Sequence, residues 1–362
     1  MVVPTFNQGG TLDLTLQSIL DHNALENLEV LVYDALSTDR TSEVLKSWEG
    51  RCSIFREKDR GQSDALQKGF QKARGDIVCW LNSDDLFFPH ACDRVRRLFA
   101  ENSEYDVISG RAVFLNHDGS FRIPFPEGPV WNDDGNPDLR ISVLQPSVFF
   151  RKSALERVGG INPRLHYVMD WDLWARFIVH QTPWLTVDEF FSAARLYPET
   201  KTASGGWTRF MELWRVARQH TGKRLPRSAL GAINSWGLED APWPVTLLFH
   251  RLHRMRSFMR GKKPQPNLHQ PQWQNESAEI VFPWYGGRVS SVRCDLEIDT
   301  PGRPGPAGEV TVTCNGQSQS APLEGSPLSC RIEGPFDEVL FRLTVNPPPE
   351  TRTRILGVYP EV

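Results

Sequence analysis

The sequence predicts an α/β domain with a mostly parallel sheet and flanking helices, followed by a helical segment and a C-terminal all-β sandwich. Roughly the first hundred residues alternate short apolar runs with segments of helical period, which is the rhythm of a parallel sheet. After about residue 275 the helical period disappears and strand-like runs follow one another. With 362 residues, the chain has room for both domains.

The N-terminal domain is predicted from four apolar runs that read as strands. These runs are residues 2–6, 28–33, 52–56 and 76–81, and helical patterns begin near residues 12, 41 and 63. Such units build a Rossmann-like sheet, in which ligands bind at the carboxyl ends of the strands. The polar residues after each strand are therefore the candidates for chemistry.

Changes in composition predict four segments. They are the α/β domain over residues 1–205, a helical extension over 206–263, a linker over 264–275 and a β-sandwich domain of unknown role over 276–362. The linker is rich in Pro and Gln, and Asn315-Gly316 reads as a hairpin turn in the last segment.

Composition excludes several classes of protein. A net charge of -3 provides no positive field for a nucleic-acid partner. No apolar run approaches the ~20 residues of a membrane-spanning helix. The six cysteines form neither a CxxC pair nor a disulfide framework, so we expect reduced cysteines and a cytoplasmic protein. Because the chain starts at its first strand, we also expect its natural start to lie upstream.

Two C-terminal features leave their roles open. Residues 243–263 combine an apolar helical face with several Arg and Lys. This pattern suits packing against the α/β domain, docking to a partner, or peripheral attachment at the inner face of the cell membrane. Trp273, Trp284 and Tyr285 suit core packing, a homo-oligomer interface or stacking on sugar rings.

Polar and acidic residues gather at four predicted strand ends or helix starts. The groups are Pro4-Thr5-Phe6-Asn7, Asp34 with Ser37-Thr38-Asp39, Asn82-Ser83-Asp84-Asp85, and Asp170-Trp171-Asp172. Taken singly, each has a structural explanation, because Asp and Ser also cap helices. Together they match the needs of sugar transfer from a nucleoside diphosphate: a grip on the base, neutralisation of the leaving diphosphate, and removal of a proton from the attacking hydroxyl.

The third group supplies oxygen ligands for a hard divalent cation, Mn²⁺ or Mg²⁺. Asp84 offers a carboxylate after a buried strand, and Asn82 offers an amide oxygen on the same side of the extended chain. Asp170, at the start of a helix, is placed to accept the hydroxyl proton.

Residues 1–205 resemble the family-2 glycosyltransferases with the GT-A fold. Six motifs carry the resemblance, in the order VVPTFNQ, YDALSTDRT, EKDRGQSDALQKGFQKARGD, WLNSDD, QPSVFFRKSALERVGG and MDWDLWARF. The resemblance implies an inverting, metal-dependent hexosyltransferase that uses a nucleotide-sugar, with a UDP-sugar favoured. It also implies a saccharide or glycolipid acceptor, in the synthesis of cell-surface polysaccharide or glycolipid.

The resemblance implies a role for each candidate residue. The base would be held by Pro4, Thr5, Phe6 and Asn7, and uracil would be contacted by Asp34. The nucleotide would be flanked by Arg60, Gly61 and Asp64. The diphosphate and metal site would be formed by Asn82, Ser83 and Asp84, and the catalytic base would be Asp170.

The chain departs from the family pattern in several places, including Gln67, which stands where asparagine is commoner. Ala35 and Leu36 replace two glycines, so we expect the turn after Asp34 to lack free use of left-handed backbone. Asn82 replaces the first aspartate of the metal motif, which removes one negative charge. Tyr197 stands where a histidine near the diphosphate is common.

These departures support an alternative, a catalytically weakened protein that binds a nucleotide-sugar or glycan. A sugar-nucleotide pyrophosphorylase would need a Gly-rich phosphate loop with a following lysine, which Gly9 and Gly10 alone do not provide. A processive synthase is disfavoured because the sequence has no QxxRW segment. Arg195 and Lys201 leave two roles open, contact with phosphate or solvation at the surface.

Overall fold

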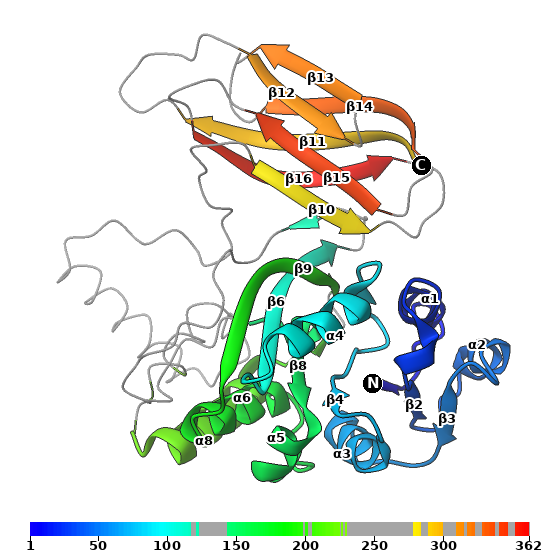
Figure 1. The fold of residues 1–362 in the computed structure, drawn as a ribbon, viewed down its shortest axis with the longest axis vertical. Coiled ribbons are helices and arrows are strands. Elements are labelled where there is room, and N and C mark those ends of the chain that lie inside the picture. Colours follow the sequence, from blue (N-terminus) through cyan, green and yellow to red (C-terminus); the bar gives the residue numbers. More distant parts are fainter. Residues whose placement is uncertain are drawn as a thin grey trace.

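The computed structural model describes residues 1–116, 121–122, 143–197, 200–201, 205–224, 226 and 229, and then the strands β10 to β16 between residues 278 and 361. An N-terminal α/β unit precedes a unit made of strands (Figure 1). The predicted fold class is confirmed: a parallel sheet carries flanking helices, and strands follow toward the C-terminus.

The first half of the sheet is parallel. β1 (Val2–Thr5) pairs with β2 (Leu31–Asp34), and β2 pairs with β3 (Ser53–Arg56). On its other edge, β1 bonds to the fourth predicted strand, because the Val2 amide donates to the Cys79 carbonyl (3.0 Å). The connections contain α1 (Leu12–Leu20), η1 (Leu25–Asn27), α2 (Thr41–Ser47) and α3 (Gln62–Lys72).

The second half of the sheet is mixed. Its strands are β4 (Ile77–Val78), β5 (Leu86–Phe87), β6 (Val107–Asn116), β7 (Phe121–Arg122), β8 (Val148–Arg151) and β9 (Trp184–Leu196). β8 runs antiparallel to both β4 and β6, whereas β9 runs parallel to β6 and antiparallel to β5. Antiparallel neighbours need no crossover helix, so the strict strand-helix rhythm of the first half is not required here.

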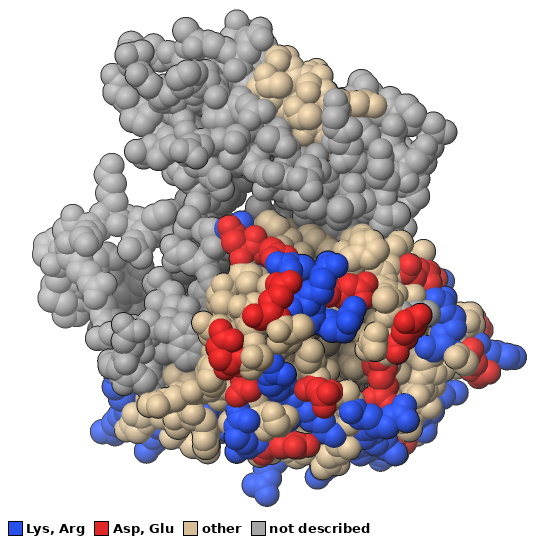
Figure 2. Space-filling view, viewed as in Figure 1, with Lys and Arg blue, Asp and Glu red and all other residues tan. Residues whose placement is uncertain are grey.

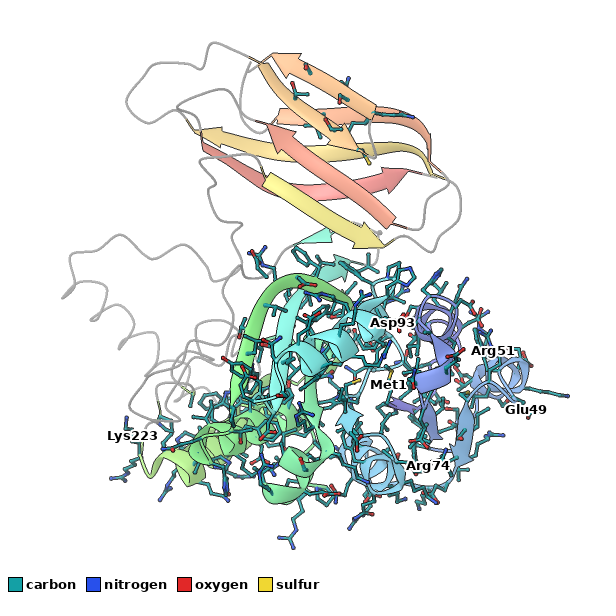
Figure 3. All side chains as sticks on the ribbon, viewed as in Figure 1. Met1, Glu49, Arg51, Arg74, Asp93 and Lys223 are labelled. Carbon is teal, nitrogen blue, oxygen red and sulfur yellow. The ribbon has the colours of Figure 1, made fainter. Side chains whose placement is uncertain are left out.

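β1 is buried on both faces of the sheet. Successive side chains of a strand point to opposite faces, so Val2 and Val3 enter different cores. Val2 packs in a cluster with Trp80, Phe150, Trp174 and Phe177, and Val3 packs in a cluster with Leu16, Leu45, Phe87 and Phe99. The Trp80 and Trp174 rings stack with their centroids 5.8 Å apart. Met1, which precedes β1, is also buried and lies between the flanking helices (Figure 3).

The remaining helices surround the second half of the sheet. They are α4 (Ala91–Glu101), η2 (Gln145–Ser147), α5 (Lys152–Arg157), α6 (Met169–Val179) and α8 (Gly206–Thr221). α8 packs against the start of α6 through Leu213 and Val216, which contact Val168. The predicted boundary at residue 205 therefore lies just before a helix that packs on the α/β unit, and the boundary itself stays a prediction.

The C-terminal strands form two antiparallel groups. Their bounds are β10 (Ala278–Pro283), β11 (Val289–Asp299), β12 (Glu309–Cys314), β13 (Gln317–Pro322), β14 (Leu328–Phe336), β15 (Leu340–Asn346) and β16 (Arg352–Glu361). One group has the order β10-β15-β12-β13, and in the other β11 lies between β14 and β16. The prediction that they form a sandwich stays a prediction.

Several C-terminal predictions lie outside the described residues. They concern the basic stretch 243–263, the linker 264–275 and the aromatic residues Trp273, Trp284 and Tyr285. Among the helices that the structure describes, none combines the length and apolarity that a membrane crossing requires. Of the cysteines in the α/β unit, Cys52, Cys79 and Cys92 are free thiols.

The packing of α3 on β1 predicts the effect of a small substitution. A Cβ atom at Gly69 would lie 2.5 Å from Cγ1 of Val2, so Gly69→Ala should overpack the core and lower the free energy of unfolding by about 1 kcal/mol or more. Gly75→Ala is the control, since its Cβ would meet a backbone oxygen at 3.6 Å. Urea unfolding of both variants checks this, and equal stabilities would contradict the packing.

Candidate active site

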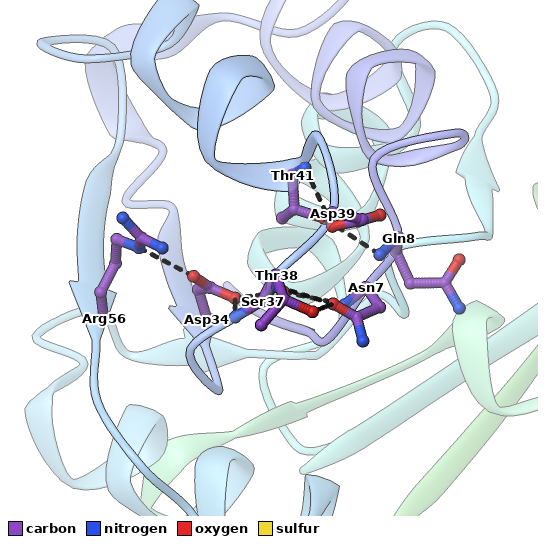
Figure 4. A network of polar contacts seen from close by, with 8 residues as sticks. All are labelled: Asn7, Gln8, Asp34, Ser37, Thr38, Asp39, Thr41 and Arg56. Atoms are coloured by element: carbon purple, nitrogen blue, oxygen red, sulfur yellow. Dashed lines mark hydrogen bonds and ion pairs between the residues drawn. The ribbon is translucent and has the colours of Figure 1, made fainter.

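The loops after β1 and β2 are joined by a network of hydrogen bonds (Figure 4). The Asn7 amide donates to Oγ of Ser37 (2.8 Å), and the Thr38 amide donates to Oδ1 of Asn7 (2.8 Å). The Gln8 amide donates to the Thr41 hydroxyl (3.0 Å). These contacts bring together the first two predicted groups, at the carboxyl ends of neighbouring parallel strands.

Asp34 is committed to the turn that follows it. Its side chain is enclosed, and the residue is 1% exposed. Oδ1 accepts hydrogen bonds from both the amide and the hydroxyl of Ser37, and Oδ2 pairs with Nε of Arg56 (2.8 Å). Asp34 therefore fixes the shape of the loop, and the predicted contact with a base stays untested.

Asp39 contacts both the start of α2 and the loop after β1. Its Oδ1 accepts from the Thr41 amide at the start of α2, and its Oδ2 accepts from the Gly9 amide (2.9 Å). Burial tends to raise the pKa of Asp39, but the hydrogen bonds from Thr41 and Gly9 outweigh it and hold the pKa below its ordinary value. The carboxylate thus joins two loops as well as the helix.

The expectation for Leu36 was wrong. The turn does use left-handed backbone, because Leu36 has a φ of 63°. For a residue with a Cβ this conformation costs roughly 1–2 kcal/mol. Leu36 is 48% exposed and Phe6, after β1, is 57% exposed, so both loops present an apolar side chain to solvent.

The other residues of the first strand end face inward. Pro4 is buried opposite Tyr33, and the buried Thr5 hydroxyl has no hydrogen-bond partner among the described residues. Only Phe6 and Asn7 of this group therefore reach the loop surface. The carbonyl of Ser83 accepts from the Thr11 hydroxyl (2.8 Å), which ties the metal-motif loop to the start of α1.

Arg60 and Asp64 form an ion pair with each other. Nη2 of Arg60 lies 2.7 Å from Oδ1 of Asp64, and this hydrogen bond lowers the pKa of the buried Asp64. Gly61, between them, has a φ of 115°. A Cβ atom there would lie 2.7 Å from the His166 ring, so only glycine fits this close approach.

Asn82 links the metal-motif loop to α3. Its Oδ1 accepts from Nε2 of Gln62 (2.6 Å), and its Nδ2 donates to Oδ2 of Asp85 (3.0 Å) and to Oε1 of Gln145 (3.3 Å). Asp85 is buried and also accepts the Arg195 amide (3.0 Å), which fastens the loop to the end of β9. Asp85 therefore holds the loop in place.

Asp84 is hydrogen bonded to Tyr197, which stands where the family pattern commonly has a histidine. The Tyr197 hydroxyl donates to Oδ2 of Asp84 (2.7 Å) and accepts from Gln8. Burial raises the pKa of Asp84. The pKa of Asp85 lies well above its usual range, through burial and through the charge of Asp84 beside it. Two neighbouring carboxylates with little solvent make this the most strained charge arrangement of the site.

The motif does not fit a cation held by protein oxygens alone. Oδ2 of Asp84, both oxygens of Asp85 and Oδ1 of Asn82 already accept hydrogen bonds. Oδ1 of Asp84 is the one carboxylate oxygen of the motif that accepts none within the described residues. No group of three or more His, Cys, Asp or Glu in these residues is placed to hold a metal ion. The predicted metal site on Asn82 and Asp84 stays untested.

Asp170, the predicted catalytic base, lies in the first turn of α6. Its Oδ1 accepts from the Trp171 amide (2.7 Å). Loss of solvent raises the pKa of Asp170, while that amide and the positive charge of Arg209 oppose the rise. Burial lowers the pKa of Arg209 to about 10, against the opposing charge of Asp170. A carboxylate with a raised pKa is better matched to taking a proton near neutral pH.

Lys201 joins the two halves of the candidate site. Its ammonium donates to Oε1 of Gln62 (2.9 Å) and to the carbonyl of His166 (3.2 Å). Burial lowers the pKa of Lys201, and the negative charges of Glu212, Asp59, Asp170 and Asp84 oppose this. Because Gln62 also donates to Asn82, the Lys201 ammonium links the metal-motif loop to the segment that precedes α6.

Several site residues were missed by the sequence analysis. Gln62 could have been found, since it follows Gly61 within a quoted motif. Glu212 accepts from the amides of His166 and Tyr167, and His220 lies 2.9 Å from Oδ1 of Asp172. These α8 residues carry no local signal, because only the packing of α8 on α6 brings them to the site.

Comparisons with known proteins agree with this geometry. Residues 1–154 match the family model described as Glycosyl transferase family 2. Over these residues the N-terminal region is similar to the family 2 glycosyltransferases. This confirms the resemblance to that family. The C-terminal strands β10 to β16 lie outside the matched residues.

Curated relatives are also glycosyltransferases. An uncharacterized glycosyltransferase of Rickettsia typhi is 23% identical over 189 residues, which are 49% of this chain and 58% of that protein. A PGL/p-HBAD biosynthesis glycosyltransferase of Mycobacterium tuberculosis is 24% identical over 180 residues, 48% of this chain and 66% of that protein. The chain thus spans less than two thirds of the length of these relatives.

Solved structures with similar chains include two complexes with nucleotide-sugars. S. aureus TarS 1-349 in complex with UDP-GlcNAc is 16% identical, with a TM-score of 0.49, over 73% of this chain and 75% of that chain. The mannosyltransferase PcManGT from Pyrobaculum calidifontis, in complex with GDP-Man and Mn2+, is 18% identical, with a TM-score of 0.49, over 73% of this chain and 80% of that chain. These ligands belong to those proteins.

The network in Figure 4 predicts that Ser37 is more important for stability than its size suggests. Ser37→Ala should lower the free energy of unfolding by about 1–3 kcal/mol, because Asp34 and the Asn7 amide each lose a partner. Ser47→Ala removes one exposed hydrogen bond and is the matched control. Urea unfolding measures both, and a loss no larger in Ser37→Ala than in the control would argue against the network.

Proposed function

We propose that this glycosyltransferase moves a sugar from a nucleotide-sugar donor to an acceptor hydroxyl, with inversion and with Asp170 as the catalytic base. The observation that supports this most directly is the Lys201 ammonium, which donates to Gln62, the partner of Asn82, and to the carbonyl of His166 in the segment that leads to Asp170. A donor diphosphate near Asp84 and an acceptor hydroxyl near Asp170 would therefore meet within one site.

The reaction is a single displacement at the anomeric carbon. Asp170 accepts the proton of the attacking hydroxyl while the bond to the leaving diphosphate breaks, through a transition state with oxocarbenium character. The new bond forms on the face opposite the leaving group, so the configuration inverts. No covalent intermediate with the enzyme is needed, because the acceptor itself is the nucleophile.

The donor is proposed to be a UDP-sugar. The loops after β1 and β2 present the exposed Phe6 and Leu36, which provide apolar surface for a base. Uracil is favoured because Asp34 stands at the base-contacting position of the family motif, although its carboxylate acts on the base only through the turn that it holds. Tighter binding of GDP or dTDP than of UDP would overturn this choice.

The acceptor is proposed to be a saccharide or a glycolipid, in the synthesis of cell-surface polysaccharide or glycolipid. The relative from Mycobacterium tuberculosis, a PGL/p-HBAD biosynthesis glycosyltransferase, supports this class of pathway. Attachment at the inner face of the membrane through residues 243–263 belongs to the same proposal. That stretch lies outside the described residues.

A second candidate function is nucleotide-sugar or glycan binding without turnover. It is supported by the contact of Tyr197 with Asp84 and by the hydrogen bonds that occupy Asn82. Release of nucleotide from the donor distinguishes the two functions, since a pure binding protein releases none.

The donor site is tested by the thermal stability of the chain with UDP, GDP and dTDP, each with Mn²⁺ and with EDTA. A ligand at ~100 times its dissociation constant adds roughly 2.7 kcal/mol to the stability of the folded state. We expect UDP to raise the melting temperature most. If no nucleoside diphosphate changes it in either condition, the proposed function is wrong.

Asp170→Asn separates binding from catalysis. The variant should keep the affinity for donor and lose turnover by about 10²-fold or more, because the amide cannot accept the proton. Release of UDP from the donor measures turnover, and calorimetry measures affinity. Asp188→Asn, whose side chain is largely exposed, is the control. Unchanged turnover in Asp170→Asn would remove this residue from the base role.

The raised pKa of Asp170 predicts the pH dependence. Since the ionised carboxylate is the active form, kcat/KM should fall as the pH drops through the pKa of Asp170, above the ordinary value of about 3.9. Arg209→Met removes a charge that lowers this pKa, so the acidic limb should move to higher pH. Arg215→Met, an exposed position of the same helix, should leave the limb in place. If the acidic limb of the pH profile does not move in Arg209→Met, the assignment of Asp170 as the base is contradicted.

A further inference from the structure

The end of β9 places two cations beside the paired carboxylates. Arg195 is fixed there because its amide donates to Oδ1 of Asp85 (3.0 Å). The Tyr197 carbonyl accepts from the Thr200 amide (3.0 Å), and this turn directs the chain to Lys201. The charges of Asp84 and Asp85 both act on Arg195, and the charge of Asp84 also acts on Lys201.

These cations have unused capacity to bind an anion. Nε of Arg195 is buried and has no hydrogen-bond partner within the described residues, which is costly for a guanidinium unless a ligand completes it. Lys201 donates to two neutral oxygens, those of Gln62 and the His166 carbonyl. Phosphate oxygens would form stronger, charge-assisted bonds with both groups.

The acidic side of the same loop has little capacity to bind a cation. Most oxygens of Asn82, Asp84 and Asp85 already accept hydrogen bonds, three of them from Gln62, Tyr197 and the Arg195 amide. Over the α/β unit, Lys and Arg are interspersed with Asp and Glu in the view of Figure 2, so an anion there would depend on particular cations rather than on a broad positive face.

We propose that Arg195 and Lys201 bind the diphosphate of the donor directly, and that their charge replaces the divalent cation in donor binding. This inference rests on the proposed function, and it differs from the metal dependence that the sequence predicts. Lys201 exchanges its neutral acceptors for phosphate oxygens when the donor binds, and Arg195 gains the partner that its Nε lacks. The leaving diphosphate is then neutralised by residues of the chain.

The test compares a nucleoside diphosphate with its nucleoside on the full chain. Calorimetry measures the affinity for UDP in EDTA and in Mn²⁺, and the affinity for uridine, which has no phosphate. We expect the UDP affinities in the two conditions to agree within about threefold. Lys201→Met and Arg195→Met should each weaken UDP by about tenfold or more and leave uridine unchanged, because only the phosphate contacts are lost. Lys201→Arg should keep most of the affinity.

The controls separate this inference from the proposed function. Lys46→Met removes an exposed cation in the last turn of α2 and should leave UDP binding unchanged. Binding of UDP that requires Mn²⁺ and is unaffected by Lys201→Met and Arg195→Met would overturn the inference while the proposed function stands. A fall in uridine affinity equal to that of UDP would also overturn it, since the substitutions would then act through the fold. If neither UDP nor another nucleoside diphosphate binds, both proposals fail.

Discussion

The position of β1 is the constraint on which the site depends. This strand is hydrogen bonded on both edges, to β2 and to residues 79–81, and its side chains are buried on both faces. Because the three segments run parallel, their carboxyl ends meet at one edge of the sheet. The loops that begin with Phe6, Ala35 and Asn82 therefore start within reach of one another, before any polar contact forms between them.

Hydrogen bonds then fix these loops to one another. Asp34 and Asp39 each accept three hydrogen bonds or ion pairs and Asp85 accepts two, and each carboxylate joins two segments that are distant in sequence. An acidic residue in a nucleotide-binding motif can thus have a structural role as well. Buried carboxylates that are fully bonded hold a loop rigid, because breaking one bond leaves an unpaired polar group.

The C-terminal side of the site is built from tertiary contacts. α8 packs on α6 through a small apolar cluster, and from there Arg209 acts on Asp170 while Glu212 holds the segment that precedes α6. The pKa of Asp170 is therefore influenced by a helix that follows the last strand of the sheet. A catalytic role for residues 206–221 cannot be recognised from their own pattern, which is that of an ordinary amphipathic helix.

The sequence by itself determined the strands of the first half, the polar residues at their ends, and the resemblance to the family 2 glycosyltransferases, since apolar periodicity and ordered motifs are local properties of the chain. It was wrong about Leu36, because the sequence carries no measure of how firmly the Asn7, Ser37 and Asp34 contacts hold a left-handed turn. Only the tertiary structure decided that Asn82 and Asp84 are already hydrogen bonded, and that Lys201 contacts Gln62 and His166. The physical reason is that hydrogen-bond occupancy and charge proximity arise between segments far apart in sequence, where no local pattern records them.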